Sequence, residues 1–197
     1  MDNLPRYRIK CKIASGGMAT VHLAHDEVLH RDVALKVVHP HLLERPETIT
    51  RFNNEARAAA SLTHDNIIKV FDYGESAGNR FIVMEYVDGL TLEELLKKHS
   101  PLPSLVLVEI CSQVLAGLAV AHEQGIFHRD IKPTNVMVDR HGCVRILDFG
   151  IAYLMNQESL TITGALVGTP KYISPEQAEG KPVTAKSDIF SVGALCF

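Results

Sequence analysis

The stretch HRDIKPTNVMV, His128 to Val138, carries three different polar groups within six residues and then becomes apolar. A carboxylate, Asp130, is followed by an ammonium, Lys132, and a carboxamide, Asn135. Charged clusters beside a proline are common in solvated loops, so this stretch alone leaves a surface loop and a chemical site equally open. The rest of the chain decides between these two interpretations.

The composition describes a globular protein. The chain has 197 residues, of which 46% are hydrophobic and 22% are charged. That length supports one sizeable core or two small lobes. The net charge of −3 gives no indication of a nucleic-acid or membrane partner. The N-terminal stretch MDNLPRYRIK is polar and charged, so we expect no signal peptide.

Cysteine and histidine spacing argues against a metal or disulfide framework. The four cysteines contain no CxxC pair, which favours a reducing, cytoplasmic location. His22 with His25, and His39 with His41, form short pairs, whereas a structural zinc site needs three or four ligands. The apolar stretch at residues 105–121 includes three polar side chains, so we expect a buried helix there and no membrane segment.

The N-terminal part of the chain is rich in predicted strands. Residues 7–13, YRIKCKI, alternate apolar and polar side chains at every step, which is typical of a strand. Further strand-like runs lie at residues 19–25, 32–39, 66–74 and 80–87. One helix is predicted at residues 47–62, where apolar side chains recur at helical spacing: Ile49, Phe52, Ala56 and Ala59.

Helix signals dominate after Gly89. Thr91 and Glu94 have the spacing of a capping box. Ser104 is expected to cap a long helix that ends shortly before Gly125.

Two short strands and a hinge complete the predicted elements. Residues 135–138 and 144–147 are strand-like, and Asp148 follows the second of them. Residues 88–91 have the character of a hinge between two lobes.

Two features of the strand-rich part indicate phosphate chemistry. Residues 14–21, ASGGMATV, form a glycine-rich turn between strands, which lets backbone N–H groups approach phosphate oxygens, although glycine pairs are also common in plain hairpins. Lys36 lies within an apolar strand and needs a partner, because burying an unpaired ammonium is costly. Glu55 on the following helix can be this partner. The two side chains would form either a plain structural ion pair or a pair that aims the Lys36 ammonium at phosphate oxygens.

The helical part offers complementary groups. Asn135 and Asp148 carry hard oxygen atoms, which suit Mg²⁺ bound to a nucleotide. Asp130 can accept a hydroxyl proton, and Lys132 can neutralise a phosphoryl group during its transfer.

Seven segments together resemble the eukaryotic-like serine/threonine protein kinases of bacteria. In the family's order they read SGGMATVHLAHD, RDVALKVV, RFNNEARAAASLTHDNIIKVFDYG, FIVMEYVDG, HRDIKPTN, DFGIA and GTPKYISPEQAEG. They cover nearly the whole chain, so the interpretation of the opening stretch as a plain surface loop is abandoned.

The resemblance implies an α+β, bilobal protein-kinase-like fold. An N-lobe with a five-stranded antiparallel sheet and one helix is expected at residues 1–88, and a mostly helical C-lobe at residues 89–197. The chain stops at SDIFSVGALCF, inside the family's central C-lobe helix, so the C-lobe is expected to be incomplete. Asp188, which in the family braces the catalytic loop, is present.

The resemblance also implies the roles of individual residues. Lys36 corresponds to the lysine that holds the α- and β-phosphates, Glu55 to its helix partner, and Asp130 to the catalytic base. Asn135 and Asp148 correspond to the metal ligands. Lys132 completes the expected catalytic set. A second set of residues is expected to bind the nucleotide: Ile13, Gly16, Gly17, Val21, Ala34, Lys36, the gatekeeper Met84, the hinge residues Glu85 and Val87, Met137 and Asp148.

ATP and Mg²⁺, with Mn²⁺ as an alternative metal, are the expected cofactors. The expected partners are proteins that offer Ser or Thr hydroxyls, with self-association for activation and no nucleic acid. The parent protein could be tethered to a membrane by a region outside this chain. Thr161 and Thr163 are predicted autophosphorylation sites, with Arg129 as the phosphate partner, whereas Thr169 is expected to bond to the catalytic residues.

Two residue types depart from the family's pattern. Ala14 and Ala19 stand where the GxGxxG loop has its outer glycines, and a methyl group there restricts the loop if a positive φ is required. Ser174 replaces the alanine of APE, which we expect to be harmless. The alternative function is a non-catalytic, kinase-like module that binds a nucleotide or a partner.

Overall fold

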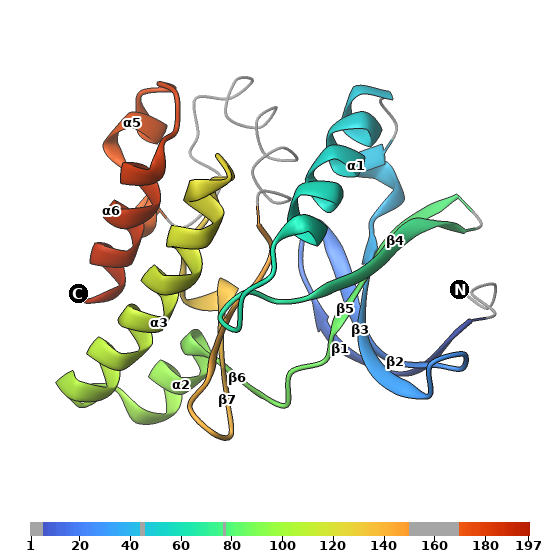
Figure 1. Ribbon diagram of the computed structural model, residues 1–197, viewed down its shortest axis with the longest axis horizontal. Coiled ribbons are helices and arrows are strands. Elements are labelled where there is room, and N and C mark those ends of the chain that lie inside the picture. The colour runs from blue at the N-terminus through green and yellow to red at the C-terminus, as the bar shows by residue number, and fades with distance from the viewer. Residues whose placement is uncertain (1–5, 44–45, 77, 150–169) are drawn as a thin grey trace. The chain divides into compact units, whose positions relative to one another are not determined.

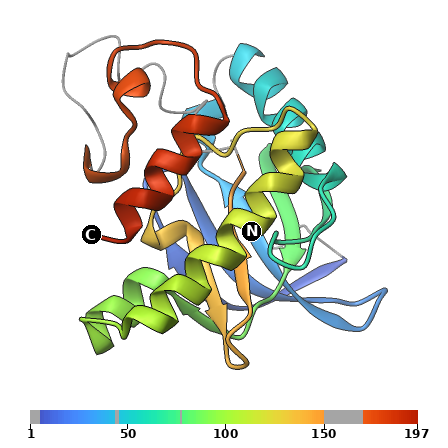
Figure 2. The ribbon, with the colours of Figure 1, turned by 60° about the vertical axis from the view of Figure 1, so that its left-hand side comes forward.

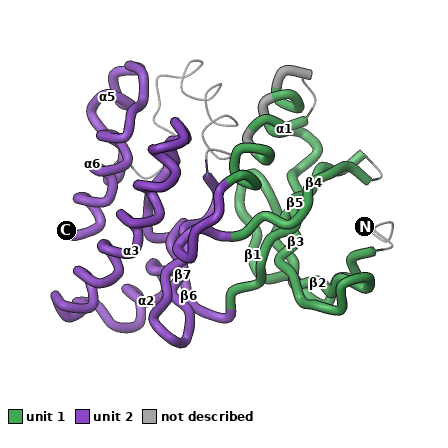
Figure 3. Tube along the Cα trace, in the orientation of Figure 1, with its two compact units in different colours: residues 1–61, 69–87 green, residues 62–68, 88–197 purple. Residues whose placement is uncertain are grey.

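The computed structural model describes residues 6–43, 46–76, 78–149 and 170–197. They divide into two compact units: unit 1 comprises Met1–Ser61 and Lys69–Val87, and unit 2 comprises Leu62–Ile68 and Asp88–Phe197 (Figure 3). Unit 1 contains a sheet and a helix, and unit 2 is mostly helical, as the α+β class predicts. Unit 2 also includes residues 62–68, which the predicted boundary at residue 88 assigned to the first lobe.

Unit 1 is built on a five-stranded antiparallel sheet with the strand order β1-β2-β3-β5-β4 (Figure 1). Its elements are β1 (Tyr7–Ser15), β2 (Ala19–Asp26), β3 (Arg31–Val38), the short helix η1 (Pro40–Leu43), α1 (Pro46–Ser61), β4 (Val70–Ser76) and β5 (Asn79–Glu85). The strand-rich composition and the single long helix predicted from periodicity, and the five-stranded sheet implied by the resemblance, are therefore confirmed.

The core of unit 1 follows from the period-two alternation of β3. Val33, Leu35 and Val37 point to one face of the sheet, because successive strand side chains alternate between faces. That face carries the core cluster, which also contains Tyr7, Ala24, Phe81 and Val83. Ala34 and Lys36 therefore point to the opposite face.

Helix α1 buries the apolar side chains that predicted it. Phe52, Ala56 and Ala59 are 2%, 0% and 5% exposed, and their spacing of four and three residues places them on one helix face. This helix lies against β4 within unit 1.

Unit 2 contains a small sheet and several helices (Figure 1). Its elements are β6 (Gly89–Thr91), α2 (Leu92–His99), α3 (Ser104–Glu123), η2 (Pro133–Asn135), β7 (Val136–Asp139), β8 (Val144–Ile146), η3 (Pro170–Tyr172), α5 (Pro175–Ala178) and α6 (Ala185–Leu195). The three strands pair in the order β6-β7-β8, and α3 and α6 lie side by side (Figure 2).

Two of the three predicted helix signals are confirmed. Thr91 and Glu94 form the predicted capping box at the start of α2. After α3, the N–H of Gly125 donates to His122 and that of Ile126 donates to Ala121, which is the Schellman pattern, and Gly125 has φ = 71°. The predicted Ser104 cap is wrong: α3 begins at Ser104 itself, and the preceding Pro103 makes no side-chain cap bond.

Helix α3 is long and apolar enough to span a membrane by length and composition alone, which is weak evidence. Within unit 2 it buries one row of side chains: Ile110, Cys111, Val114, Gly117, Leu118 and Ala121. The described structure leaves Leu105 and Val108 84% and 61% exposed, so the helix that was predicted to be buried is buried on one side only.

The chain around residue 68 departs from the predicted strand at residues 66–74, because β4 begins only at Val70. Ile67 and Ile68 are buried in unit 2, where the N–H of Ile68 donates to the C=O of Ile146. The N–H of Ile146 donates in turn to the C=O of Asn66. These bonds attach residues 66–68 to β8, and these residues are therefore not part of β4.

The segment predicted as a hinge, residues 88–91, is largely strand β6. Gly89 pairs with Asp139 on β7. A Cβ atom on Gly89 would lie 2.3 Å from the carbonyl oxygen of Val138, so only glycine allows these two strands to approach this closely.

Candidate active site

The catalytic loop, residues 128–135, brings the three polar groups of the opening stretch together. The side-chain amide of Asn135 donates to the backbone oxygen of Asp130 at 2.8 Å and to its carboxylate at 3.0 Å. The ammonium of Lys132 lies 2.7 Å from the same carboxylate. The Asp130 carboxylate is thus held in place by one amide and one cation.

Asp188 on α6 anchors the backbone of the catalytic loop. Its buried carboxylate accepts the N–H groups of His128 at 2.9 Å and Arg129 at 2.8 Å. His122, at the end of α3, donates from Nε2 to the same carboxylate at 2.7 Å. Arg129 has φ = 69°, a strained value for a residue with a side chain, and the two bonds from Asp188 help to hold it there.

His128 connects the catalytic loop to the residue before Asp148. Its Nδ1 accepts the N–H of Asp130 at 3.2 Å, so the ring proton is on Nε2, which donates to the C=O of Leu147 at 2.6 Å. The ring is fully buried and packs edge-on against Phe149. Sequence patterns did not predict the contact of His122 with Asp188 or that of His128 with Leu147, because these partners are distant in the sequence.

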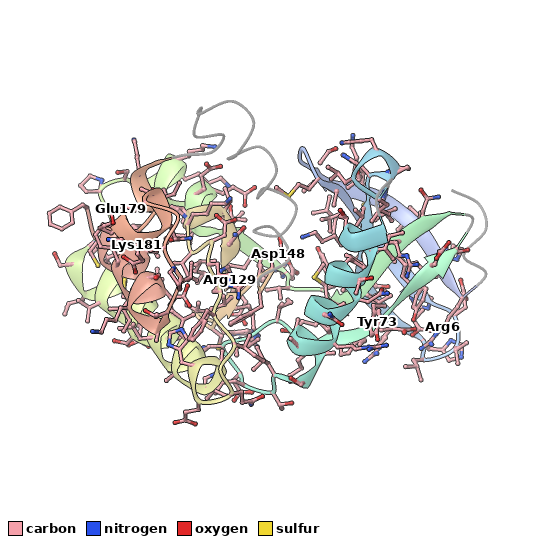
Figure 4. All side chains as sticks on the ribbon, turned by 90° about the horizontal axis from the view of Figure 1, so that it is seen from above. Arg6, Tyr73, Arg129, Asp148, Glu179 and Lys181 are labelled. Carbon is pink, nitrogen blue, oxygen red and sulfur yellow. The ribbon has the colours of Figure 1, made fainter. Side chains whose placement is uncertain are left out.

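The hairpin of β7 and β8 brings the two expected metal ligands to neighbouring positions. Val136 pairs with Ile146, so Asn135 and Leu147 lie next to each other at the hairpin's open end. The N–H of Leu147 donates to the C=O of Asn135 at 2.9 Å, and Asp148 follows directly. Asp148 also has a positive φ, 56°, and is labelled with Arg129 in Figure 4.

The donor atoms of Asn135 and Asp148 fit a magnesium-type ion. Both hydrogens of the Asn135 amide point to Asp130, so its oxygen is the atom left for a metal. An amide oxygen and a carboxylate are hard ligands, and Mg²⁺ usually takes one or two carboxylates and completes its shell with waters and phosphates. The described residues contain no group of three or more His, Cys, Asp and Glu side chains that could hold a metal without such help.

Four of the expected nucleotide-binding residues share one face of the unit 1 sheet. Val21 lies opposite Lys36, and Ala34 lies opposite Met84, and directly opposed residues point to the same face. Lys36 is 8% exposed. The side chain of its expected partner Glu55 lies outside the described residues, so the ion pair stays a prediction.

The glycine turn, Ser15–Thr20, needs its glycines neither for conformation nor for packing. The N–H of Gly16 donates to the C=O of Ala19 at 3.0 Å, and no residue from 14 to 19 has a positive φ. A Cβ atom on Gly16 or Gly17 would meet no atom of the protein within 4 Å. The methyl groups of Ala14 and Ala19 therefore cause no backbone strain, and the space beside the glycines suits a close approach by phosphate.

The remaining expected residues lie in strands or at strand ends, except Val87, which lies between β5 and β6. Ile13, near the end of β1, is 49% exposed, and Met84 is 7% exposed. The N–H of Glu85 donates to the C=O of Lys69, so that donor is already used within unit 1. Met137 is half-buried on β7 in unit 2.

Residues 7–197 match the family model described as the protein kinase domain. The chain belongs to the protein kinase domain family. Among curated proteins, it is 42% identical to the serine/threonine-protein kinase PrkC of Bacillus subtilis over 192 residues, 98% of this chain and 30% of that protein. It is 44% identical to the kinase PknB of Mycobacterium leprae, which it matches over 98% of its own length and 32% of the relative's. The chain thus spans about a third of these relatives.

Solved structures give the same result. The kinase domain of Mycobacterium tuberculosis PknI superposes with a TM-score of 0.80 and 28% identity over 100% of this chain and 73% of that one. The bilobal protein kinase fold predicted from the sequence is confirmed. Proteins of this family use ATP and a divalent metal ion and act on protein substrates.

A pocket of about 550 Å³ lies beside the loop at residues 128–135, within unit 2. It is formed by α2, the catalytic loop and η3, and its lining includes Glu93, Leu96, Lys97, Lys132, Pro133, Lys171 and Tyr172. Three of these side chains are cationic and one is anionic.

A second brace joins the segment after η3 to α6. Ser174 and Gln177 form a capping box at α5, so the Ser174 side chain takes part in the local structure, and Gln177 also donates to the C=O of Arg129. The Ser187 hydroxyl donates to Glu176 and holds the pKa of that carboxyl below its ordinary value. Thr161, Thr163 and Thr169 lie outside the described residues.

Proposed function

We propose that this chain is the catalytic region of a serine/threonine protein kinase that transfers the γ-phosphoryl group of ATP to Ser or Thr hydroxyls of proteins. The observation that carries the proposal is the Asp130 carboxylate, held by Lys132 and Asn135 in a loop that Asp188 fixes. The relatives reported above are named serine/threonine-protein kinases, which supports the same assignment.

In the proposed reaction the protein positions the reactants and stabilises charge. The substrate hydroxyl donates to a carboxylate oxygen of Asp130, which orients it and accepts its proton as the phosphoryl group is transferred. Lys132 neutralises negative charge on the transferring group, because its ammonium lies beside Asp130. Asn135 and Asp148 would hold Mg²⁺, with Mn²⁺ as an alternative, and the bound ion neutralises phosphate charge.

The unit 1 residues would bind the nucleotide. Lys36 would contact the α- and β-phosphates with Glu55 as its partner, and the amide of Gly17 would face phosphate oxygens, since the N–H of Gly16 already donates to Ala19. The proposed adenine contacts are Ile13, Val21, Ala34, Met84, the backbone of Glu85 and Val87, and Met137. Lys132 and Lys36 thereby act on different parts of the nucleotide.

The pocket beside the catalytic loop is the proposed binding place for residues that flank the acceptor hydroxyl. Lys97, Lys132 and Lys171 give it a cationic lining, although Lys97 also pairs with Glu93 and Lys132 with Asp130, each at 2.7 Å. Opposite charges across an interface favour binding and fix register. We infer a preference for protein substrates with acidic residues near the acceptor.

The remaining proposals concern regulation and location. Autophosphorylation at Thr161 or Thr163 and self-association for activation stay predictions. Use of ATP supports a location in the cytoplasm. No observation favours the non-catalytic alternative, because the chain retains Lys36, Glu55, Asp130, Asn135 and Asp148.

The decisive experiment is phosphoryl transfer from labelled ATP by the wild-type chain and the Asp130→Asn variant. Transfer by the variant should fall by about 10²–10⁴-fold, the usual contribution of a general base, while ATP affinity stays close to that of the wild type. The control is Asp65→Asn, which removes an exposed carboxylate of unit 2 and should leave transfer unchanged. Retention of more than a tenth of the wild-type rate by Asp130→Asn would contradict its role.

A further inference from the structure

His39, the residue directly after β3, contacts the glycine turn at three points. Its N–H donates to the C=O of Met18 at 2.9 Å. Its Nδ1 lies 3.2 Å from the C=O of Gly17, and its Nε2 lies 3.1 Å from the hydroxyl oxygen of Thr20. The half-buried side chain and backbone of His39 thus contact the turn from Gly17 to Thr20.

The partners determine the proton positions on the ring. A carbonyl oxygen only accepts hydrogen bonds, so Nδ1 of His39 carries the proton that is donated to Gly17. Nε2 of the neutral ring then accepts the hydroxyl proton of Thr20. The Thr20 oxygen lies 3.3 Å from the hydroxyl of Ser15 and can accept from it. Both ring nitrogens are therefore satisfied by the turn alone.

The register of β2 and β3 explains why residue 39 occupies this position. Ala19 pairs with Val38, so the next residue along β3 reaches Met18 as the turn begins. Lys36 lies three positions earlier on the same strand. His39 therefore ties the glycine turn to the strand that carries the phosphate-binding lysine of the proposed function.

The turn has few other constraints. Gly16 and Gly17 have no side chain, and the space around their Cα atoms is open. Glycine also loses more conformational freedom on ordering than other residues, so an unanchored turn would have to be ordered by the nucleotide at a cost in affinity.

We propose that His39 is a positioning residue that pre-orders the glycine turn, and with it the amide of Gly17, for the nucleotide phosphates, through the carbonyl of Gly17 and the hydroxyl of Thr20. The inference rests on the proposed nucleotide binding by this turn. It assigns His39 no contact with the substrate or the reacting atoms. Its loss should therefore weaken ATP binding more than it slows phosphoryl transfer at saturating ATP.

The test compares His39→Ala with two variants that each restore one contact. Asn places its amide nitrogen near the position of Nδ1 and can donate to Gly17, whereas Gln reaches the position of Nε2 and can accept from Thr20. His41→Ala is the matched control: its ring packs 5.7 Å from that of His39, and in the described part of the chain it makes no hydrogen bond to the turn.

Calorimetric titration with Mg²⁺–ADP, amide hydrogen exchange of residues 16–20 and the KM and kcat for ATP are the measurements. His39→Ala should raise the nucleotide dissociation constant about three- to tenfold, the range expected for one or two net hydrogen bonds, and speed exchange in the turn. His39→Asn should recover part of the affinity, and His41→Ala should match the wild type. Thr20→Val combined with His39→Ala should have less than the summed effect of the two single changes.

The outcomes separate this inference from the proposed function. If the wild-type chain binds no nucleotide, the proposed function fails and the inference fails with it. If the wild type binds nucleotide while His39→Ala leaves both the affinity and the exchange of the turn unchanged, the kinase assignment stands and the role of His39 is overturned. A fall in kcat with unchanged KM would also overturn it.

Discussion

Single residues in this protein gain their roles from partners that are distant in the sequence. Asp188 holds the backbone of Arg129 in a left-handed conformation across 59 residues of chain, and His128 holds Leu147 across 19. The motif HRDIKPTN predicted that Asp130, Lys132 and Asn135 would meet, because they are close in sequence. The supporting roles of His122, His128 and His39 were not predictable in this way, because each depends on a tertiary contact.

His22 carries a residue-scale prediction. Its ring is 9% exposed on the core face of the sheet opposite Leu35, and within the described residues neither ring nitrogen has a hydrogen-bond partner. Burial, with Lys12 as a smaller cause, lowers the pKa of His22 below its ordinary value. His22→Leu should raise the free energy of unfolding at pH 7 by about 1–2 kcal/mol, because it removes unsatisfied buried polar atoms.

The same variant should change the pH dependence. A lowered pKa in the folded state means that the unfolded chain binds the proton more readily, so wild-type stability is lost as the pH falls below the ordinary histidine value of about 6.5. Urea unfolding at pH 7 and pH 5 should show a smaller loss for His22→Leu than for the wild type. The exposed His141→Gln is the control and should behave as the wild type does. Equal losses in all three proteins would refute the prediction.

At the scale of elements, local sequence patterns predicted which strands and helices form but not all of their ends. The alternation in β1 and β3 and the apolar spacing in α1 reflect burial of one face, which is a local property. The start of β4 was misplaced because Ile67 and Ile68 pack in unit 2, and strand patterns do not reveal which core receives a side chain. Ser104 was misjudged because a residue suited to capping can also begin the helix itself.

Two glycines allow an element-scale test of close packing. In Gly89→Ala the new methyl group would lie 2.3 Å from the carbonyl oxygen of Val138, so β6 and β7 would have to separate, and we expect a loss of about 1–3 kcal/mol in the free energy of unfolding. In Gly193→Ala, within α6, the new methyl group would meet no atom within 4 Å. This change should raise the free energy of unfolding by about 0.5–1 kcal/mol, because alanine has a higher helix propensity than glycine. Chemical denaturation of both variants checks the difference, and a Gly89→Ala protein as stable as Gly193→Ala would show that β6 and β7 are not tightly paired.

For the whole molecule, the family resemblance predicted the kinase fold because seven motifs occur in order. The residues that it assigned fall on both units, with Lys36 in unit 1 and Asp130 and Asp148 in unit 2. Motifs did not predict the cationic pocket, because its lysines come from three separate segments that only folding brings together. The pair of Lys36 with Glu55 and the phosphorylation of Thr161 and Thr163 remain predictions.

The proposed preference for acidic substrates leads to a prediction at the scale of the whole molecule. The chain carries a net charge of −3, which disfavours approach by acidic proteins, whereas three lysines line the pocket, of which Lys97 pairs with Glu93 and Lys132 with Asp130, beside Lys171. Peptides with Asp or Glu around an acceptor Thr should therefore be phosphorylated with a lower KM than neutral or basic peptides of the same length. The advantage should shrink as salt rises, because exposed charges are screened.

Lys171→Glu tests whether the pocket is responsible. Reversing this exposed charge should raise KM for the acidic peptide about fivefold or more, equivalent to about 1 kcal/mol for loss and reversal of one exposed charge pair, and should leave KM for a neutral peptide unchanged. Lys98→Glu is the matched control, since Lys98 is exposed on α2 beside Lys97 but does not line the pocket. Steady-state kinetics with the acidic and neutral peptides measures both values. An equal effect of the two variants would mean that long-range charge, and not the pocket, selects the substrate, because the chain's net charge changes equally in both.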